Sequence, residues 1–129
     1  GSEMCIRDSR YLKEQDPAVK ILAIEPADSP LLSGGKAGPH GLQGLGANFI
    51  PQNLDQSLMD QICTVTTEEA YTAARELAAT EGVLAGISSG AALHGATLLA
   101  KRPENQERNI IVLLPDTGER YLSIGLFDR

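Results

Sequence analysis

The chain has 129 residues, enough for one modest domain with a hydrophobic core, and its composition is ordinary for a globular protein. Its formal net charge of −6 disfavours nucleic acid and anionic membranes as partners, and no stretch is apolar for long enough to span a bilayer. The two cysteines, Cys5 and Cys63, have neither disulfide-framework nor zinc-site spacing. We therefore expect a reducing, cytoplasmic compartment, no metal, and a small buried side chain at Cys63.

The first half of the chain predicts one strand and one long loop. Residues 1–9 show no helical or strand period and resemble a translated sequencing adaptor, so we expect a non-native scar there. Residues 10–15 are predicted to be the end of a helix, stopped by Pro17. Residues 19–26 are nearly all apolar, which is typical of a strand buried on both faces. Residues 27–55 are rich in Gly and Pro, and such long ordered loops are usually functional.

A second strand and a helix are predicted after this loop. Residues 61–66 have strand composition. Thr66 and Glu69 have the spacing of a capping box for a helix over residues 68–80, and Gly82 suits the position just after its end. The helix carries an apolar stripe at helical spacing: Ala70, Ala73, Ala74, Leu77 and Ala78.

A further helix, a third strand and the start of a last helix complete the pattern. Residues 88–101 predict a helix with Ser88 or Ser89 as its N-cap. Residues 109–115 predict a third buried strand, and residues 116–123 predict a last helix. Because apolar strands alternate with helices, the fold class is α/β with a parallel sheet. Three strands are few for such a domain, which indicates part of a larger one.

The stretch Gly-Ile-Ser-Ser-Gly, residues 86–90, matches the G-x-S-x-G pattern of a hydrolase nucleophile elbow. That elbow needs a strand directly before the serine, and an acid followed by a histidine after it. Only three residues separate Gly82 from the motif, and no acid lies between Ser88 and His94, the one later histidine. We therefore disfavour a nucleophile. A serine at a helix start can instead cap the helix or help to bind a ligand.

Three collinear motifs cover much of the chain: AGPHGLQGLGANFIP, EGVLAGISSGAA and LPDTGERYLS. They resemble the cysteine synthase (O-acetylserine sulfhydrylase) family, and the likeness extends from Arg10 to the end. The resemblance implies part of the three-layer type II fold of pyridoxal-phosphate enzymes, the fold of the tryptophan synthase β subunit. It also implies a β-replacement in which O-acetylserine loses acetate to give an aminoacrylate, and sulfide adds to give L-cysteine.

The resemblance implies cofactor roles for two segments. Ser88 would hydrogen-bond the pyridine nitrogen of pyridoxal 5'-phosphate, with Ser89 as the neighbouring alternative. A neutral hydroxyl partner leaves that nitrogen largely unprotonated, a weaker electron sink that suits β-elimination. Pro115 and Asp116 would shape the wall behind the ring. Asp116 has an equally good alternative as a helix N-cap, with Glu119 at capping-box distance.

The loop GLQGLGANF resembles the family segment beside the substrate. Gly44 and Gly46 would let the backbone approach the substrate closely, and Gln43 would line the entry. The alternative is a turn-rich loop in which the glycines only supply positive φ. We expect His40 to be a hydrogen-bonding residue of this loop, and His94 to lie on a helix face.

The family's Schiff-base lysine, its phosphate loop and its Asn-containing substrate loop would all precede Arg10. None of the chain's four lysines matches the family's lysine motif: Lys13, Lys20, Lys36 and Lys101. We therefore assign no catalytic residue. We expect residues 10–129 to be the C-terminal portion of a larger catalytic domain, itself cut at the C-terminus, and inactive alone.

The resemblance also implies a homodimer and binding of the C-terminal tail of serine acetyltransferase. Two alternative enzymes share the fold: cystathionine β-synthase and the sulfhydrylase that uses phosphoserine or thiosulfate. The loop GPHGLQGLGANFIP favours the O-acetylserine type. An alternative of another class is a regulator or scaffold that kept the fold and lost the cofactor.

Overall fold

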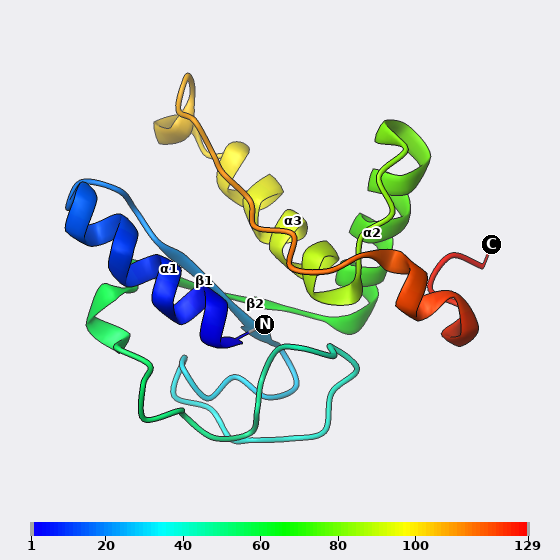
Figure 1. The fold of residues 1–129 in the computed structure, drawn as a ribbon, viewed down its shortest axis with the longest axis horizontal. Helices are drawn as coiled ribbons and strands as arrows, with labels where there is room; N and C mark the ends of the chain where they lie inside the picture. Colours follow the sequence, from blue (N-terminus) through cyan, green and yellow to red (C-terminus); the bar gives the residue numbers. More distant parts are fainter. Residues whose placement is uncertain (1, 129) are drawn as a thin grey trace.

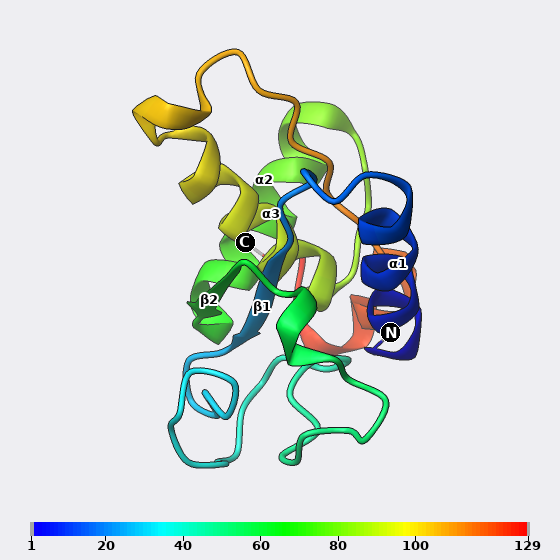
Figure 2. The same ribbon diagram turned by 90° about the vertical axis from the view of Figure 1, so that its left-hand side faces the viewer.

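The computed structural model describes residues 2–128, and Figure 1 shows their arrangement. The helices and strands follow in the order α1 (Ser2–Gln15), β1 (Leu22–Pro26), β2 (Gln61–Val65), α2 (Thr67–Glu81) and α3 (Ile87–Ala100). Three short 3-10 helices are η1 (Gln56–Leu58), η2 (Pro103–Asn105) and η3 (Gly118–Ile124). The two strands lie side by side, and the long loop between them gathers beyond the C-terminal end of β1 (Figures 1 and 2).

Strands β1 and β2 pair in parallel, with Leu22 opposite Gln61 and Pro26 opposite Val65. Helix α3 packs on the face that carries Leu22 and Ile24, since a Cβ at Gly95 would touch both side chains. This confirms the parallel α/β arrangement. The expected burial of β1 on both faces is wrong for its first three residues, which are only half-buried.

The predicted third strand is absent from the described residues. Residues 109–115 are extended but form no ladder, and Ile111 is 93% exposed. The nearest regular pairing is an isolated antiparallel bridge between Ala85 and Thr117. A strand requires a neighbour that accepts and donates its backbone hydrogen bonds, and residues 2–128 place none beside this segment. Residues 2–128 therefore form two strands where the sequence predicts three.

Helix α2 begins and ends as its sequence predicts. Thr66 accepts from the backbone N–H of Glu69, and the Glu69 carboxylate accepts from the N–H of Thr66 at 2.8 Å. This reciprocal pair is a capping box. Gly82 adopts φ 69° and closes the helix, a conformation that costs glycine little. The predicted stripe contains the buried residues of this helix: Ala70, Ala73 and Ala74.

Helix α3 begins one residue earlier than predicted. Its N-cap is Gly86, which has no side chain, so the expected cap at Ser88 or Ser89 is wrong. Both serines lie inside the first turn. The start is shifted because Gly86 is packed against Asp116 and Tyr121: a Cβ at Gly86 would lie 2.0 Å from Asp116 Oδ1. Gly90 allows α2 to cross closely, since a Cβ there would lie 2.1 Å from the carbonyl oxygen of Ala70.

The two ends of the described chain differ from the predictions. Helix α1 extends back to Ser2, whereas the sequence predicts helix only for residues 10–15. Residues 2–9 of the expected scar therefore lie in this helix, and residue 1 lies outside the described residues. The last helix is a 3-10 helix that begins at Gly118, with Thr117 as its N-cap. Asp116 is therefore not a helix cap, because its carboxylate is turned toward Tyr121 instead.

The buried core lies where α2, α3, the long loop and the C-terminal segment meet. Its largest fully buried apolar side chains come from separate segments: Leu42, Val65, Ile87 and Leu126. The loop and the C-terminal segment are thus held against the N-terminal end of α3. None of the helices described between residues 2 and 128 is long and apolar enough to cross a membrane.

Candidate cofactor site

The first turn of α3 presents two adjacent serines with different surroundings. Ser89 is fully buried, and its hydroxyl donates to the backbone carbonyl of Asp116 at 3.4 Å. Ser88 is 6% exposed, and its hydroxyl makes no hydrogen bond with any of the described residues 2–128. The positive end of the helix dipole lies at this turn. Ser88 is therefore the serine with a hydroxyl available for a ligand.

The long loop brings Gly44 directly to Ser88. A Cβ at Gly44 would lie 3.6 Å from Ser88 Oγ, and Gly44 has φ +89°, which glycine adopts without strain. Gln43 and Gly44 are exposed, while Leu42 beside them is fully buried in the core. The structure thus brings the predicted substrate loop and the predicted cofactor serine together, from segments more than 40 residues apart.

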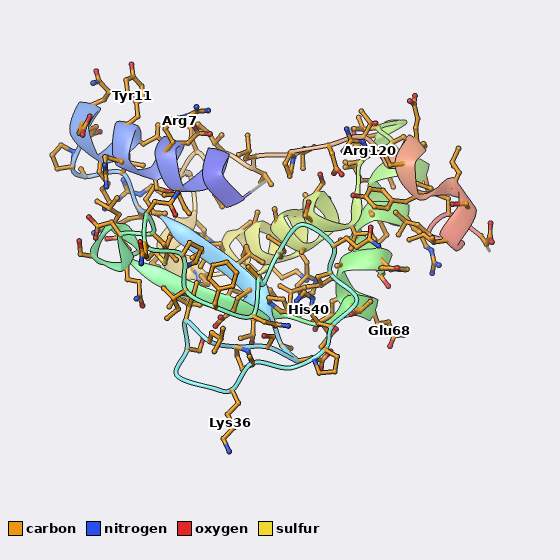
Figure 3. The ribbon with its side chains drawn as sticks, turned by 60° about the horizontal axis from the view of Figure 1, so that its bottom comes forward. Arg7, Tyr11, Lys36, His40, Glu68 and Arg120 are labelled. Atoms are coloured by element: carbon orange, nitrogen blue, oxygen red, sulfur yellow. The ribbon has the colours of Figure 1, made fainter. Side chains whose placement is uncertain are left out.

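His40 holds this loop through both ring nitrogens. The backbone N–H of Leu42 donates to His40 Nδ1 at 3.2 Å, and His40 Nε2 lies 2.8 Å from the carbonyl oxygen of Gly46. Figure 3 shows His40 within the loop, close to the start of α2. The expectation that His40 is a hydrogen-bonding residue of the loop is confirmed.

Asp116 fastens the C-terminal segment to the start of α3. Its carbonyl accepts from the backbone N–H of Gly86 at 3.2 Å and from Ser89. Its Oδ2 accepts from the Tyr121 hydroxyl at 2.5 Å, and this hydrogen bond is the main reason that the pKa of Tyr121 rises to about 12. Its Oδ1 is buried and has no hydrogen-bond partner among the described residues. Pro115, just before it, is half-buried.

Sequence reasoning missed Tyr121 and two residues that anchor the loop. Glu25 is buried at the end of β1, and its carboxylate accepts from the backbone N–H groups of Leu32 and Ser33 at 2.8 and 2.9 Å. Ser29 is also buried and donates to Asn48 Oδ1 at 2.7 Å. The sequence signal for Glu25 is that it is a single acid within an apolar strand. Its partners could not be found, because they lie in a loop without periodicity.

The remaining candidates lie away from Ser88. His94 is half-buried, and its Nε2 lies 3.6 Å from Glu69 Oε1, so it faces α2 from its helix face as expected. Lys13 and Lys20 both bind Asp60, Lys36 points outward from the loop (Figure 3), and Lys101 is the C-cap at the far end of α3. Within the part of the chain that the structure describes, no group of three His, Cys, Asp or Glu is placed to hold a metal ion.

Comparison with known proteins agrees with this geometry. The family model described as "Pyridoxal-phosphate dependent enzyme" matches residues 9–116, most of the chain. The chain belongs to this family. Its fold is accordingly part of the type II pyridoxal-phosphate fold, and the predicted family is confirmed.

Named relatives in this family are cysteine synthases. The cysteine synthase of Haemophilus influenzae is 50% identical over 116 residues, covering 85% of this chain and 37% of its own. That of Buchnera aphidicola is 46% identical, covering 94% of this chain and 41% of its own. The crystal structure of the Entamoeba histolytica cysteine synthase superposes with a TM-score of 0.90 at 40% identity, covering 94% of this chain and 36% of that one. The chain thus spans about two fifths of these relatives.

Proposed function

We propose that the chain is the C-terminal portion of a cysteine synthase that makes L-cysteine from O-acetylserine and sulfide. The observation that carries the proposal is the meeting of Ser88 and Gly44 at the start of α3. Identities of 46% and 50% to cysteine synthases support the reaction, and so does the structural likeness to O-acetylserine sulfhydrylases. Residues 1–9 are a non-native scar in this proposal, and the family match begins only at residue 9.

The residues at this site fit pyridoxal 5'-phosphate. When bound, this cofactor withdraws electrons from the substrate carbon that loses its proton. A pyridine nitrogen needs a hydrogen-bonding partner in a buried site. Ser88 is a buried residue, and its hydroxyl makes no hydrogen bond with any described residue. Ser89 is the weaker candidate, because its hydroxyl already donates to Asp116. A neutral hydroxyl holds the ring without placing a charge beside it.

Two other segments complete the proposed pocket. Asp116 and Pro115 form its back wall, where Asp116 fixes the first turn of α3 through Gly86 and Ser89. Gln43 and Gly44 form its front and are exposed to an incoming substrate, while Gly46 is held between Pro26 and His40. The backbone of Gly44 can approach a substrate closely because no side chain intervenes.

The test is a chimera in which residues 10–129 replace the matching segment of the Haemophilus influenzae cysteine synthase. We expect this chimera to bind the cofactor and to form cysteine from O-acetylserine and sulfide. Ser88→Ala should lower kcat/KM by about tenfold or more, because one buried hydrogen bond is lost. Ser89→Ala, the matched control, should have a smaller effect.

Two results would contradict the proposal. One is a chimera that folds and binds cofactor but forms no cysteine, or that prefers homocysteine, phosphoserine or thiosulfate as substrate. The other is turnover by the isolated 129-residue chain. We expect none, because its four lysines are bound elsewhere, exposed, or at the far end of α3.

The proposal extends to assembly and location. The resemblance to the family supports a cytoplasmic homodimer whose active site accepts the C-terminal tail of a serine acetyltransferase. Sedimentation of the chimera tests the dimer. A synthetic peptide with that tail sequence should compete with O-acetylserine in the cysteine assay, and a peptide that does not compete would contradict this part.

A further inference from the structure

We propose that His40 is a positioning residue that sets Gly44 against Ser88 by holding the loop of residues 41–46 with both ring nitrogens. The functional meaning of this loop rests on the proposed function. The geometry itself does not, because it involves only residues of this chain. Neither the family match nor any named relative assigns a role to this histidine.

The two contacts of His40 determine which nitrogen carries the proton. The backbone N–H of Leu42 can only donate, so Nδ1 must be an acceptor without a proton. The carbonyl oxygen of Gly46 can only accept, so Nε2 must carry the proton. A neutral ring with its proton on Nε2 satisfies both contacts. The alternative tautomer would place a donor against a donor and an acceptor against an acceptor.

These two bonds close the short segment that carries Gly44. Between the bonded residues Leu42 and Gly46, the N–H of Leu45 also donates to the carbonyl of Leu42, at 3.3 Å. Gly46 lies in a tight gap, because a Cβ there would be 2.6 Å from Pro26 Cγ and 2.8 Å from His40 Nε2. The imidazole therefore holds the end of this segment, and Gly46 lies between the ring and Pro26, the last residue of β1.

The first two residues of the 41–46 segment are also fastened to the rest of the fold. The N–H of Gly41 donates to Thr67 Oγ1 at 3.3 Å, which ties the loop to the first residue of α2. Leu42 is fully buried in the core. Gly44 itself is exposed and makes its contact with Ser88 across the site. Without His40, the segment from Leu42 to Gly46 would lose the side-chain hydrogen bonds at both of its ends, and Gly44 would be held less firmly against Ser88.

The first test is the tautomer in the unmodified chain. The sequence contains two histidines, His40 and His94, so a ¹⁵N spectrum of the imidazoles in alkaline solution contains two rings to assign. We expect His40 to show a fixed proton on Nε2. A proton on Nδ1, or an equal mixture of both tautomers, would overturn the proposal without any variant being made.

Three variants then separate the two bonds. His40→Asn keeps an acceptor near the Nδ1 position, His40→Gln keeps a donor near the Nε2 position, and His40→Ala removes both. We expect amide exchange of Leu42 to be about tenfold faster in the Ala and Gln variants and near its original rate in the Asn variant. Contact between Gly44 and Ser88, measured as a nuclear Overhauser effect, should weaken most in the Ala variant.

The control is His94→Ala, which removes the other histidine from the surface of α3. It should leave the exchange of Leu42 and the contact between Gly44 and Ser88 unchanged. Exchange in α2 should be the same in the His40 variants as in the unmodified chain, which shows that each of them is folded. For His94→Ala the comparison uses α2 beyond its first turn, because Glu69 loses its contact with His94. Equal exchange of Leu42 in His40→Ala and in the unmodified chain would overturn the proposal. These measurements need no cofactor. They can therefore contradict the role of His40 while the chimera still forms cysteine, and they can support that role while the chimera forms none.

Discussion

At the scale of single residues, the hydroxyls of Ser88 and Ser89 differ by about 100° around the axis of α3. That rotation points Ser89 at the carbonyl of Asp116 and leaves Ser88 without a partner among the described residues. The choice between them therefore depends on Asp116, which comes from a segment 27 residues further along. The sequence places two serines together, and only the packing of that segment distinguishes them.

Tyr121 supports this arrangement, and its removal tests it. Tyr121→Phe removes the donor to Asp116 Oδ2, while Asp116 Oδ1 already has no partner in the described residues. We expect a loss of about 1–3 kcal/mol in the free energy of unfolding, measured with urea. Tyr11→Phe, a change at a 60% exposed ring, is the control and should cost almost nothing.

The same variant has an alkaline signature. The pKa of Tyr121 is raised to about 12, so its stabilising contribution is full below the ordinary tyrosine value of 10.0 and is lost as pH rises through about 12. Absorbance titration should show one late phenol ionisation that disappears in Tyr121→Phe. A late ionisation that persists in this variant would contradict the assignment.

At the scale of elements, local signals explain the helix boundaries that were predicted well. The capping box of Thr66 and Glu69 and the left-handed Gly82 act within one turn of the chain, so α2 could be located from sequence. The predicted start of α3 was wrong because the N-cap position falls on Gly86, which packs closely against Asp116 and Tyr121. No local sequence pattern reveals this packing.

Gly90→Ala tests the close crossing of α2 and α3. The new Cβ would lie 2.1 Å from the Ala70 carbonyl oxygen, and backbone cannot move aside without separating the helices. We expect a net loss of about 2 kcal/mol in the free energy of unfolding, even though alanine favours helix. Gly95→Ala on the same helix is the control: it meets the flexible end of Ile24 and should cost less. Equal stability of Gly90→Ala and the unmodified chain would contradict this packing.

At the scale of the whole molecule, Asp60 connects three parts of the chain. Its carboxylate accepts from Lys13 of α1 at 2.7 Å, from the N–H of Ile21 at 2.8 Å and from Lys20 at 3.3 Å. These contacts, led by the one with Lys13, lower the pKa of Asp60 from 3.8 to about 2. Helix α1 is thereby fastened to the region where both strands begin.

The lowered pKa gives a pH dependence with a definite sign. Asp60 should stabilise the fold fully above about pH 4, and this contribution should be lost as pH falls toward about 2. Its size is about 1 kcal/mol or less, because solvent screens the pairs. Asp60→Asn should reduce the difference in urea midpoint between pH 7 and pH 2, whereas Asp28→Asn, at an exposed loop position, should not. An unchanged difference in Asp60→Asn would contradict this role.

By itself, the sequence determined the fold class, the family, the two paired strands and α2 with both of its ends, and it indicated the segments of the proposed site. These follow from periodicity, local caps and extended motifs, which act over a few residues or are specific through their length. Tertiary structure decided that residues 109–115 form no strand, that Gly86 starts α3, and that Ser88 rather than Ser89 has an unoccupied hydroxyl. Each of these depends on a partner distant in sequence. Backbone groups and buried polar side chains form hydrogen bonds with the segments that the tertiary fold brings next to them, and a local sequence pattern does not reveal those segments.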